Sequence, residues 1–129
     1  MKLEKLARLR SIFNGPEMVA KLKELIPAAN DGFVTYGEVW KSFRPHTPWG
    51  PVPKREVGNA LGRLTHYCVT KKHPILSVLL VNAKDRAMTD KAIENVYNAC
   101  KELGISVGSD PREFVLGQIE KSRSFYLNA

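Results

Sequence analysis

Three side chains that lie close together in the sequence, His66, Cys68 and His73, are of types that bind zinc or act as a nucleophile with its base. A structural zinc site has four ligands and usually takes two of them from a Cys-x-x-Cys or His-x-x-x-His pair, and this segment has neither. We place Cys68 on the apolar side of its predicted helix, where a thiol packs as a small hydrophobic group. We therefore expect no metal, no cofactor and no cysteine nucleophile.

Two carboxylates near the basic part of the chain, Glu38 and Glu56, are candidates for a general acid and base pair. Glu38 stands three residues after Thr35, which is the spacing of a helix capping box, and Glu56 is one helix residue among basic neighbours. The sequence contains no glycine-rich phosphate loop. These observations predict a protein that is not an enzyme.

The positive charge of the chain is concentrated in one segment. The chain has 20 lysines and arginines, 13 acidic residues and a net charge of +7, and residues 39–86 carry all of that excess. Helix-turn-helix modules concentrate charge in this way because phosphate contacts supply most of their non-specific affinity. Double-stranded DNA is therefore the first expected partner, and a solvated basic face is the alternative. The basic residues of the segment are Lys41, Arg44, Lys54, Arg55, Arg63, Lys71, Lys72, Lys84 and Arg86.

One predicted helix in this segment, residues 54–67, has a polar side that suits DNA contacts. Its apolar residues recur at helical spacing and form a single stripe. Arg55 and Arg63 point away from that stripe, so they are the best candidates for contacts to DNA. Lys54 and Asn59 complete the expected contact set on this helix.

Four further residues are candidates for the same interface. Lys71 and Lys72 suit phosphate contacts as wing-like residues beside the next predicted strand, although solvated lysines are the ordinary outcome. Tyr36, in the first turn of a predicted helix, either contacts DNA or packs in the core. Trp49, in a proline-rich loop, either stacks on a base or a partner protein or closes the loop onto the core.

The elements that position these residues are mainly helices. Residues 44–53 hold four of the eight prolines and predict a stiff loop that is neither helix nor central strand. Residues 75–81 are rich in aliphatic side chains and predict one buried strand. Amphipathic spacing and helix-start signals predict helices over residues 3–13, 16–26, 36–43, 54–67, 90–103 and 110–125.

Three short segments in order resemble a known family. They are residues 34–39 (Val-Thr-Tyr-Gly-Glu-Val), 55–63 (Arg-Glu-Val-Gly-Asn-Ala-Leu-Gly-Arg) and 74–76 (Pro-Ile-Leu). Together, over residues 30–82, they resemble the DNA-binding domain of the alkylguanine-DNA alkyltransferases and of their non-catalytic alkyltransferase-like relatives. The resemblance implies a winged-helix-like domain.

This resemblance also implies roles for particular residues. Tyr36 matches the tyrosine that presses on the phosphate of the target nucleotide, and Arg55 matches the arginine that enters the base stack when that nucleotide rotates out. The helix carrying Arg55 would lie in the minor groove. Gly58, Ala60 and Gly62 would keep that helix thin enough to approach a narrow groove.

The sequence departs from this family at the active site. Aligning the Pro-Ile-Leu segment places residues 78–81 (Val-Leu-Leu-Val) where the family has Pro-Cys-His-Arg, so Leu79 stands in place of the acceptor thiol. Alkyl transfer needs an activated thiolate, which a leucine cannot provide. The resemblance therefore implies DNA binding, with lesion or flipped-base recognition, but without alkyl transfer.

Length and composition complete the expected organisation. A chain of 129 residues forms one domain, and we expect residues 30–82 to be its DNA-binding core and residues 88–125 a C-terminal helical addition. The sequence has neither a continuous apolar run of membrane-spanning length nor a secretory signal, so we expect a cytoplasmic protein without membrane contact. The predicted fold is mainly α with a small β element, a winged-helix-like helix-turn-helix domain with additional N- and C-terminal helices.

Three functions follow from these observations. The first is a non-enzymatic protein that binds double-stranded DNA through a basic recognition helix. The second is a protein-interaction module, an adaptor or inhibitor whose Trp49 loop and C-terminal helices bind an acidic protein. The third is an enzyme acting on nucleic acid through a site that these motifs do not reveal.

Overall fold

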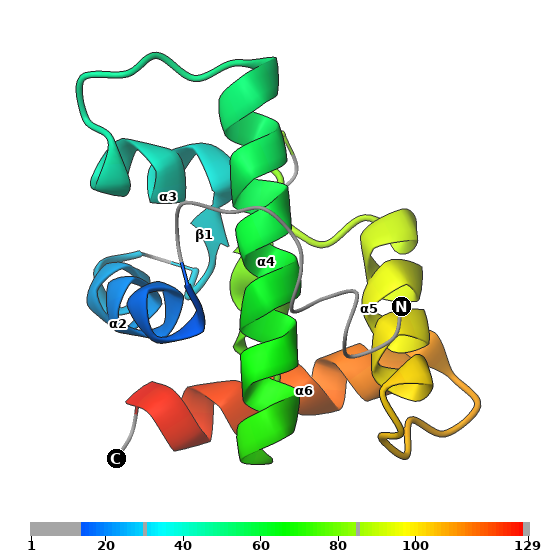
Figure 1. Ribbon diagram of the computed structural model, residues 1–129. Coiled ribbons are helices and arrows are strands. Elements are labelled where there is room, and N and C mark those ends of the chain that lie inside the picture. Colours follow the sequence, from blue (N-terminus) through cyan, green and yellow to red (C-terminus); the bar gives the residue numbers. More distant parts are fainter. Residues whose placement is uncertain (1–13, 30, 85, 128–129) are drawn as a thin grey trace.

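The computed structural model describes residues 14–29, 31–84 and 86–127. These residues are mainly helical, and the predicted helix 3–13 lies outside them. The described helices are α2 (Gly15–Leu25), α3 (Tyr36–Phe43), α4 (Pro51–Lys71), α5 (Asp90–Glu102) and α6 (Pro111–Leu127), with short 3₁₀ segments η1 (Ile26–Ala28) and η2 (Leu76–Leu79). Figure 1 shows α4 running through the middle of the molecule, with α2 and α3 on one side and α5 on the other.

Each described helix except α4 begins within one residue of its predicted start. Thr35 and Glu38 form the expected capping box: the Glu38 amide donates to Thr35 Oγ1 at 3.1 Å and the Thr35 amide donates to Glu38 Oε1 at 3.0 Å. Asn14 and Glu17 form a second capping box at the start of α2. A capping box satisfies amide groups that a helix start leaves without partners, so these short motifs fix the starts of α2 and α3.

The central helix α4 is longer than predicted at both ends. The prediction that residues 51–53 are loop is wrong, because Pro51, Val52 and Pro53 form the first turn of the helix. First-turn amides have no partner within a helix, so a proline there loses no hydrogen bond. At the other end α4 continues to Lys71, and Lys72 stops it with a left-handed backbone, φ 59°.

The predicted strand over residues 75–81 is buried, as expected, but it is mostly not a strand. Residues 76–79 form η2, and only Leu80–Val81 is extended, as strand β2. β2 pairs in parallel with β1 (Val34–Thr35), in the register Val34 to Leu80. A short apolar run indicates burial on all sides but does not distinguish a strand from a tight helical turn.

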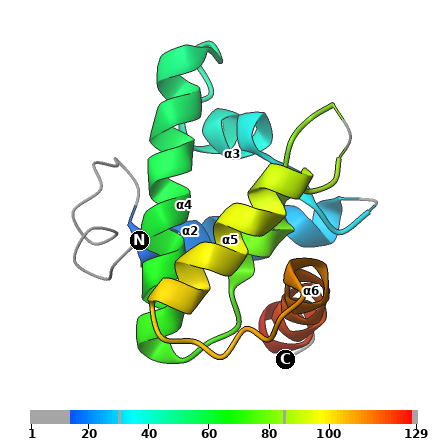
Figure 2. The ribbon, with the colours of Figure 1, turned by 90° about the vertical axis from the view of Figure 1, so that its right-hand side faces the viewer.

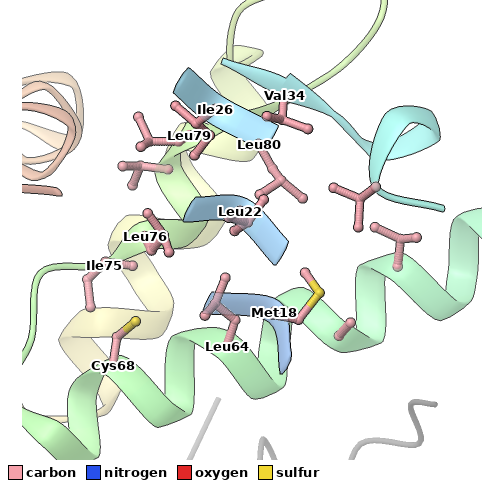
Figure 3. Close-up of a cluster of buried hydrophobic side chains, with 14 of the residues drawn as sticks. Met18, Leu22, Ile26, Val34, Leu64, Cys68, Ile75, Leu76, Leu79 and Leu80 are labelled. Atoms are coloured by element: carbon pink, nitrogen blue, oxygen red, sulfur yellow. The ribbon is translucent and has the colours of Figure 1, made fainter. Parts of the chain in front are cut away.

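The core lies between the apolar side of α4 and the segment containing η2. Val57, Leu64 and Cys68 are fully buried, as the helical spacing predicts, whereas Leu61 is half-buried. Figure 3 shows Leu64 and Cys68 facing Met18 from α2 and Leu76 from η2. Burial of one continuous stripe fixes the rotation of α4 about its axis, and therefore which side chains it turns outward.

The two predicted C-terminal helices are present and pack onto the rest of the fold. In Figure 1 α6 runs across the direction of α4, whereas Figure 2 shows the two helices apart, and α6 packs mainly against α5 and η2. Gln118 Oε1 accepts a hydrogen bond from the Ile75 amide at 2.9 Å, and the Tyr126 hydroxyl donates to the Pro74 carbonyl at 3.0 Å. The addition therefore closes one end of α4.

The described β structure does not contain a wing. A wing is a hairpin of neighbouring antiparallel strands, whereas β1 and β2 are parallel and lie on either side of α4 in the sequence. The winged-helix detail stays a prediction. Within the described ranges no helix has both the length and the apolar character needed to cross a membrane.

Candidate nucleic-acid interface

Three of the predicted DNA contacts share the side of α4 that is turned away from the core. Arg55, Asn59 and Arg63 follow one another at four-residue intervals, so they form a row along the helix. Arg55 is exposed, and Asn59 and Arg63 are half-buried. Such a row places hydrogen-bond donors and positive charges about one helical turn apart. This arrangement suits contacts to a line of phosphates or base edges.

The start of α4, α3 and the loop between them surround a hollow that we call the Trp49 cleft. Its volume is about 480 Å³, within the size range of ligand-binding pockets. Lys41 comes from α3 and Lys54 from the first turn of α4. The complete lining is Thr35, Tyr36, Gly37, Glu38, Lys41, Trp49, Lys54, Asn82 and Ala83.

The proline-rich loop holds Trp49 at the surface and not in the core. This loop, residues 44–50, lies at the upper end of α4 beside α3 (Figure 1). Trp40 Nε1 donates to the Thr47 carbonyl at 2.9 Å, which ties the loop to α3. The Trp49 side chain is 46% exposed, and its ring lies over Gly37, where a β-carbon would be 3.9 Å from Trp49 Cδ2.

Tyr36 separates the Trp49 cleft from a second cavity. This cavity, about 250 Å³, lies between α4 and α5, and Tyr36, Gly58, Leu61 and Gly62 are among its lining residues. Tyr36 is partly buried, and this burial raises the pKa of its phenol. Tyr36 thus packs against the core and lines both hollows, and its contact with DNA stays a prediction.

The small residues of α4 do not all lie on the same side of the helix. Gly58 and Gly62 line the cavity beside α5, and a β-carbon at Gly58 would have no atom within 4 Å. Ala60 is fully buried against the core. The prediction that Ala60 narrows the DNA-facing side is therefore wrong, since an i to i+2 step turns a helical side chain to a different face.

Sequence reasoning missed an ion-pair network behind the Trp49 cleft. Arg86 donates to both carboxylate oxygens of Asp31, at 2.8 and 3.1 Å, and to Glu38 Oε1 at 3.0 Å. These hydrogen bonds lower the pKa of Asp31 to about 2, and the Arg86 and Thr35 bonds also outweigh desolvation to lower that of Glu38. Arg86 is therefore neutralised locally, and the basic segment has less free charge than its composition indicates.

Lys71 and Lys72 are far from the predicted contacts at the start of α4. Arg55 and Lys71 are separated by sixteen residues of one helix, which corresponds to about 24 Å along its axis. Lys72 lines a different cavity, of about 320 Å³, together with His73 and Lys121. Arg63 lies midway, eight residues from Arg55 and eight from Lys71, so the predicted contacts are spread along α4, and Lys71 and Lys72 are far only from those at its start.

The two thiols are in environments that suppress reactivity. Cys68 and Cys100 are fully buried, and burial raises the pKa of Cys68 and raises that of Cys100 to about 12. Leu79, which stands where the alkyltransferases have their acceptor cysteine, is also fully buried. His73 stacks on Phe125, with ring centroids 4.7 Å apart.

The residue types that bind metals are dispersed. Among the described residues no three histidine, cysteine, aspartate or glutamate side chains gather as metal ligands would.

Comparison of the chain with known protein families, with curated proteins and with solved structures gave no significant match. Function must therefore be inferred from the chemistry of this chain itself.

Proposed function

We propose that the protein binds double-stranded DNA through the outward side of α4 and does not alter the DNA chemically. The observation that carries this proposal is the row formed by Arg55, Asn59 and Arg63, set opposite the buried stripe of the same helix. Lys54 extends the row toward the Trp49 cleft. In this proposal α3 and α4 act as a helix-turn-helix pair with α4 as the recognition helix.

The balance of charges along α4 supports a polyanionic partner. The helix has five basic residues, Lys54, Arg55, Arg63 and Lys71 within it and Lys72 at its cap, but one acidic residue, Glu56. Phosphate contacts by lysine and arginine release counterions from DNA, so binding through this surface weakens steeply as salt rises.

The resemblance to the alkyltransferases adds a finer proposal. We infer that α4 enters the minor groove, with Arg55 at the base stack and Tyr36 near a backbone phosphate. The cavity between α4 and α5 has Tyr36 on its wall and is the place that a displaced base would occupy. A leucine, Leu79, stands in place of the family's acceptor cysteine, and the lining of this cavity contains no cysteine, so such binding would recognise a lesion without repairing it.

A titration of labelled blunt duplex DNA at several salt concentrations tests the proposal. We expect affinity to fall steeply with salt, and each of Arg55→Ala and Arg63→Ala to lower the slope of log affinity against log salt by about one. Arg112→Ala is the matched control, because Arg112 is an exposed arginine on α6 that pairs with Asp90. Absence of duplex affinity at low salt would exclude the proposal.

A protein partner is the second candidate function, and the surface of α6 is the observation that favours it. Leu116 is 63% exposed and Phe125 is 48% exposed, so α6 presents two large apolar side chains to solvent. Leu116 also lines a cavity of about 200 Å³ with Phe33 and Met88. This function would be supported if the protein captured one acidic protein in a stoichiometric amount. The capture should persist after nuclease treatment and should be lost in Leu116→Asp.

A further inference from the structure

The Trp49 cleft has a combination of groups that the duplex-binding row lacks. It presents an exposed aromatic ring from the loop 44–50 beside two ammonium groups, those of Lys41 and Lys54. Aromatic rings bind nucleobases by stacking, and lysines bind the phosphates that connect them. The cleft therefore has the two kinds of group that recognise a nucleotide.

The charge in the cleft is available for a ligand. Within the described part of the chain, neither Lys41 nor Lys54 forms an ion pair. The one carboxylate on the lining, Glu38, is occupied by Arg86 and by the Thr35 amide. The cleft is thus positively charged, although an acidic residue forms part of its wall.

The open state of the cleft is built into the fold. The hydrogen bond from Trp40 to the Thr47 carbonyl fixes the loop on α3, and Gly37 gives the Trp49 ring a place to lie without filling the hollow. A tryptophan that is 46% exposed at the edge of a cavity of about 480 Å³ keeps ring surface free for contact. Large aromatic side chains usually bury most of their surface, so this exposure indicates a binding role.

We propose that the Trp49 cleft binds one unpaired nucleotide of a DNA strand whose duplex part lies on α4. This inference rests on the proposed DNA binding. The base stacks on Trp49, and Lys41 and Lys54 contact the adjoining phosphates. A paired base cannot take this position, because its two faces are covered by its neighbours in the double helix. The cleft therefore selects duplexes with a single-stranded tail, and it does so with little preference for base type.

Binding of two labelled DNAs tests this proposal: a blunt duplex, and the same duplex with a short oligothymidine tail. We expect the wild type to bind the tailed DNA about tenfold more tightly. Trp49→Ala should remove this preference and leave blunt-duplex affinity unchanged, whereas Trp49→Phe should retain most of it. Lys41→Ala should reduce it. Phe125→Ala, which removes an equally exposed aromatic ring from α6, should leave the preference intact.

Tryptophan fluorescence gives a second readout. The chain has two tryptophans, and Trp40 is 6% exposed, so Trp49 is the one that a base can reach. The tailed DNA should quench the fluorescence of the wild type more than blunt DNA does, and Trp49→Phe should abolish this difference.

The outcomes separate the two proposals. Binding of blunt duplex without preference for the tail, or a preference that persists in Trp49→Ala, would refute the cleft proposal and leave duplex binding in place. Equal weakening on both DNAs in Trp49→Ala would also refute it. Absence of binding to either DNA would refute both proposals.

Discussion

The two ends of α4 are held by different kinds of interaction. At its C-terminal end Cys68 is fully buried and contacts the Tyr126 hydroxyl of α6, which also bonds to the Pro74 carbonyl. At its N-terminal end the helix begins without a side-chain cap, beside the Trp49 cleft and the solvent-exposed pairs of Arg86. Both ends contribute buried residues to the core, but side chains of α6 hold the C-terminal end, whereas the N-terminal end carries exposed charge and borders an open hollow.

A truncation in the buried stripe is expected to have the largest effect on stability. Leu64 is fully buried, so Leu64→Ala should lower the free energy of unfolding by about 3 kcal/mol through lost transfer energy and the cavity left behind. Urea denaturation measures this change. Leu116→Ala, at a leucine that is 63% exposed, is the control and should change it by less than about 0.5 kcal/mol. Equal losses in the two variants would contradict the assignment of stability to the covered stripe.

Loss of one hydroxyl at the closed end should have an intermediate effect. Tyr126→Phe removes the donor to the Pro74 carbonyl and the contact of 3.4 Å with Cys68 Sγ, and we expect a loss of about 1–2 kcal/mol. Tyr97→Phe is the comparison, because the Tyr97 hydroxyl bonds the Gly108 carbonyl at an exposed site. A larger loss in Tyr97→Phe would show that the α5–α6 loop, and not the contact of α6 with α4, closes this end.

A substitution at Lys72, the residue that ends α4, should have a smaller effect on the free energy of unfolding, and of opposite sign. Its left-handed backbone, φ 59°, is unfavourable for a side chain with a β-carbon, so Lys72→Gly should raise the free energy of unfolding by about 0.5–1 kcal/mol. Lys71→Gly, one residue earlier and still helical, should lower it by about 1 kcal/mol. Thermal unfolding of the two variants checks the signs, and a loss of stability in Lys72→Gly would contradict this assignment of the cap.

The ion pairs of Arg86 at the N-terminal end of α4 should have the smallest effect on the free energy of unfolding at neutral pH. Their contribution should become visible as a loss of stability in acid. The folded pKa of Asp31 is about 2 against an ordinary 3.8, and that of Glu38 is also lowered. Lowered carboxyl pKa values contribute stability above the unfolded values, and this contribution is lost as pH falls through the folded values. We therefore expect the urea midpoint to fall between about pH 4.5 and pH 2.

Arg86→Ala removes the main cause of the lowered pKa of Asp31 and one cause of the lowered pKa of Glu38, and it should reduce this acid dependence. At neutral pH it should lower the urea midpoint by less than Leu64→Ala does, since exposed ion pairs are screened by water. Asp31→Asn should remove more of the acid dependence than Glu38→Gln, because the pKa of Asp31 is lowered to about 2, whereas desolvation offsets part of the lowering at Glu38. An unchanged slope in Arg86→Ala would show that other groups control unfolding in acid.

Local patterns predicted the parts of the fold that depend on neighbours in the sequence. The capping box of Thr35 and Glu38 involves residues three apart, and the buried side of α4 follows from 3.6-residue spacing. The predictions failed where one local pattern fits two structures. Prolines 51 and 53 suit either a loop or the first turn of a helix, and the apolar residues 75–81 suit any buried conformation.

The candidate site was predictable in its residue types but not in its arrangement. The row of Arg55, Asn59 and Arg63 follows from the helix alone, whereas the hollow beside Trp49 requires α3, the loop and the turn after β2 to meet. No sequence signal shows that Arg86 contacts Asp31, since 55 positions separate them. Composition counts Arg86 toward a basic surface, but the fold pairs it with carboxylates.

The sequence by itself determined where the described helices other than α4 begin, which side of α4 is buried and where positive charge is concentrated, because each depends on residue type and short-range spacing. Tertiary structure alone decided which of those charges stay available, that Lys71 and Lys72 lie far from Arg55, and that Trp49 lies over Gly37 at the edge of a cavity. The physical reason is that burial and ion pairing arise when distant segments share one core.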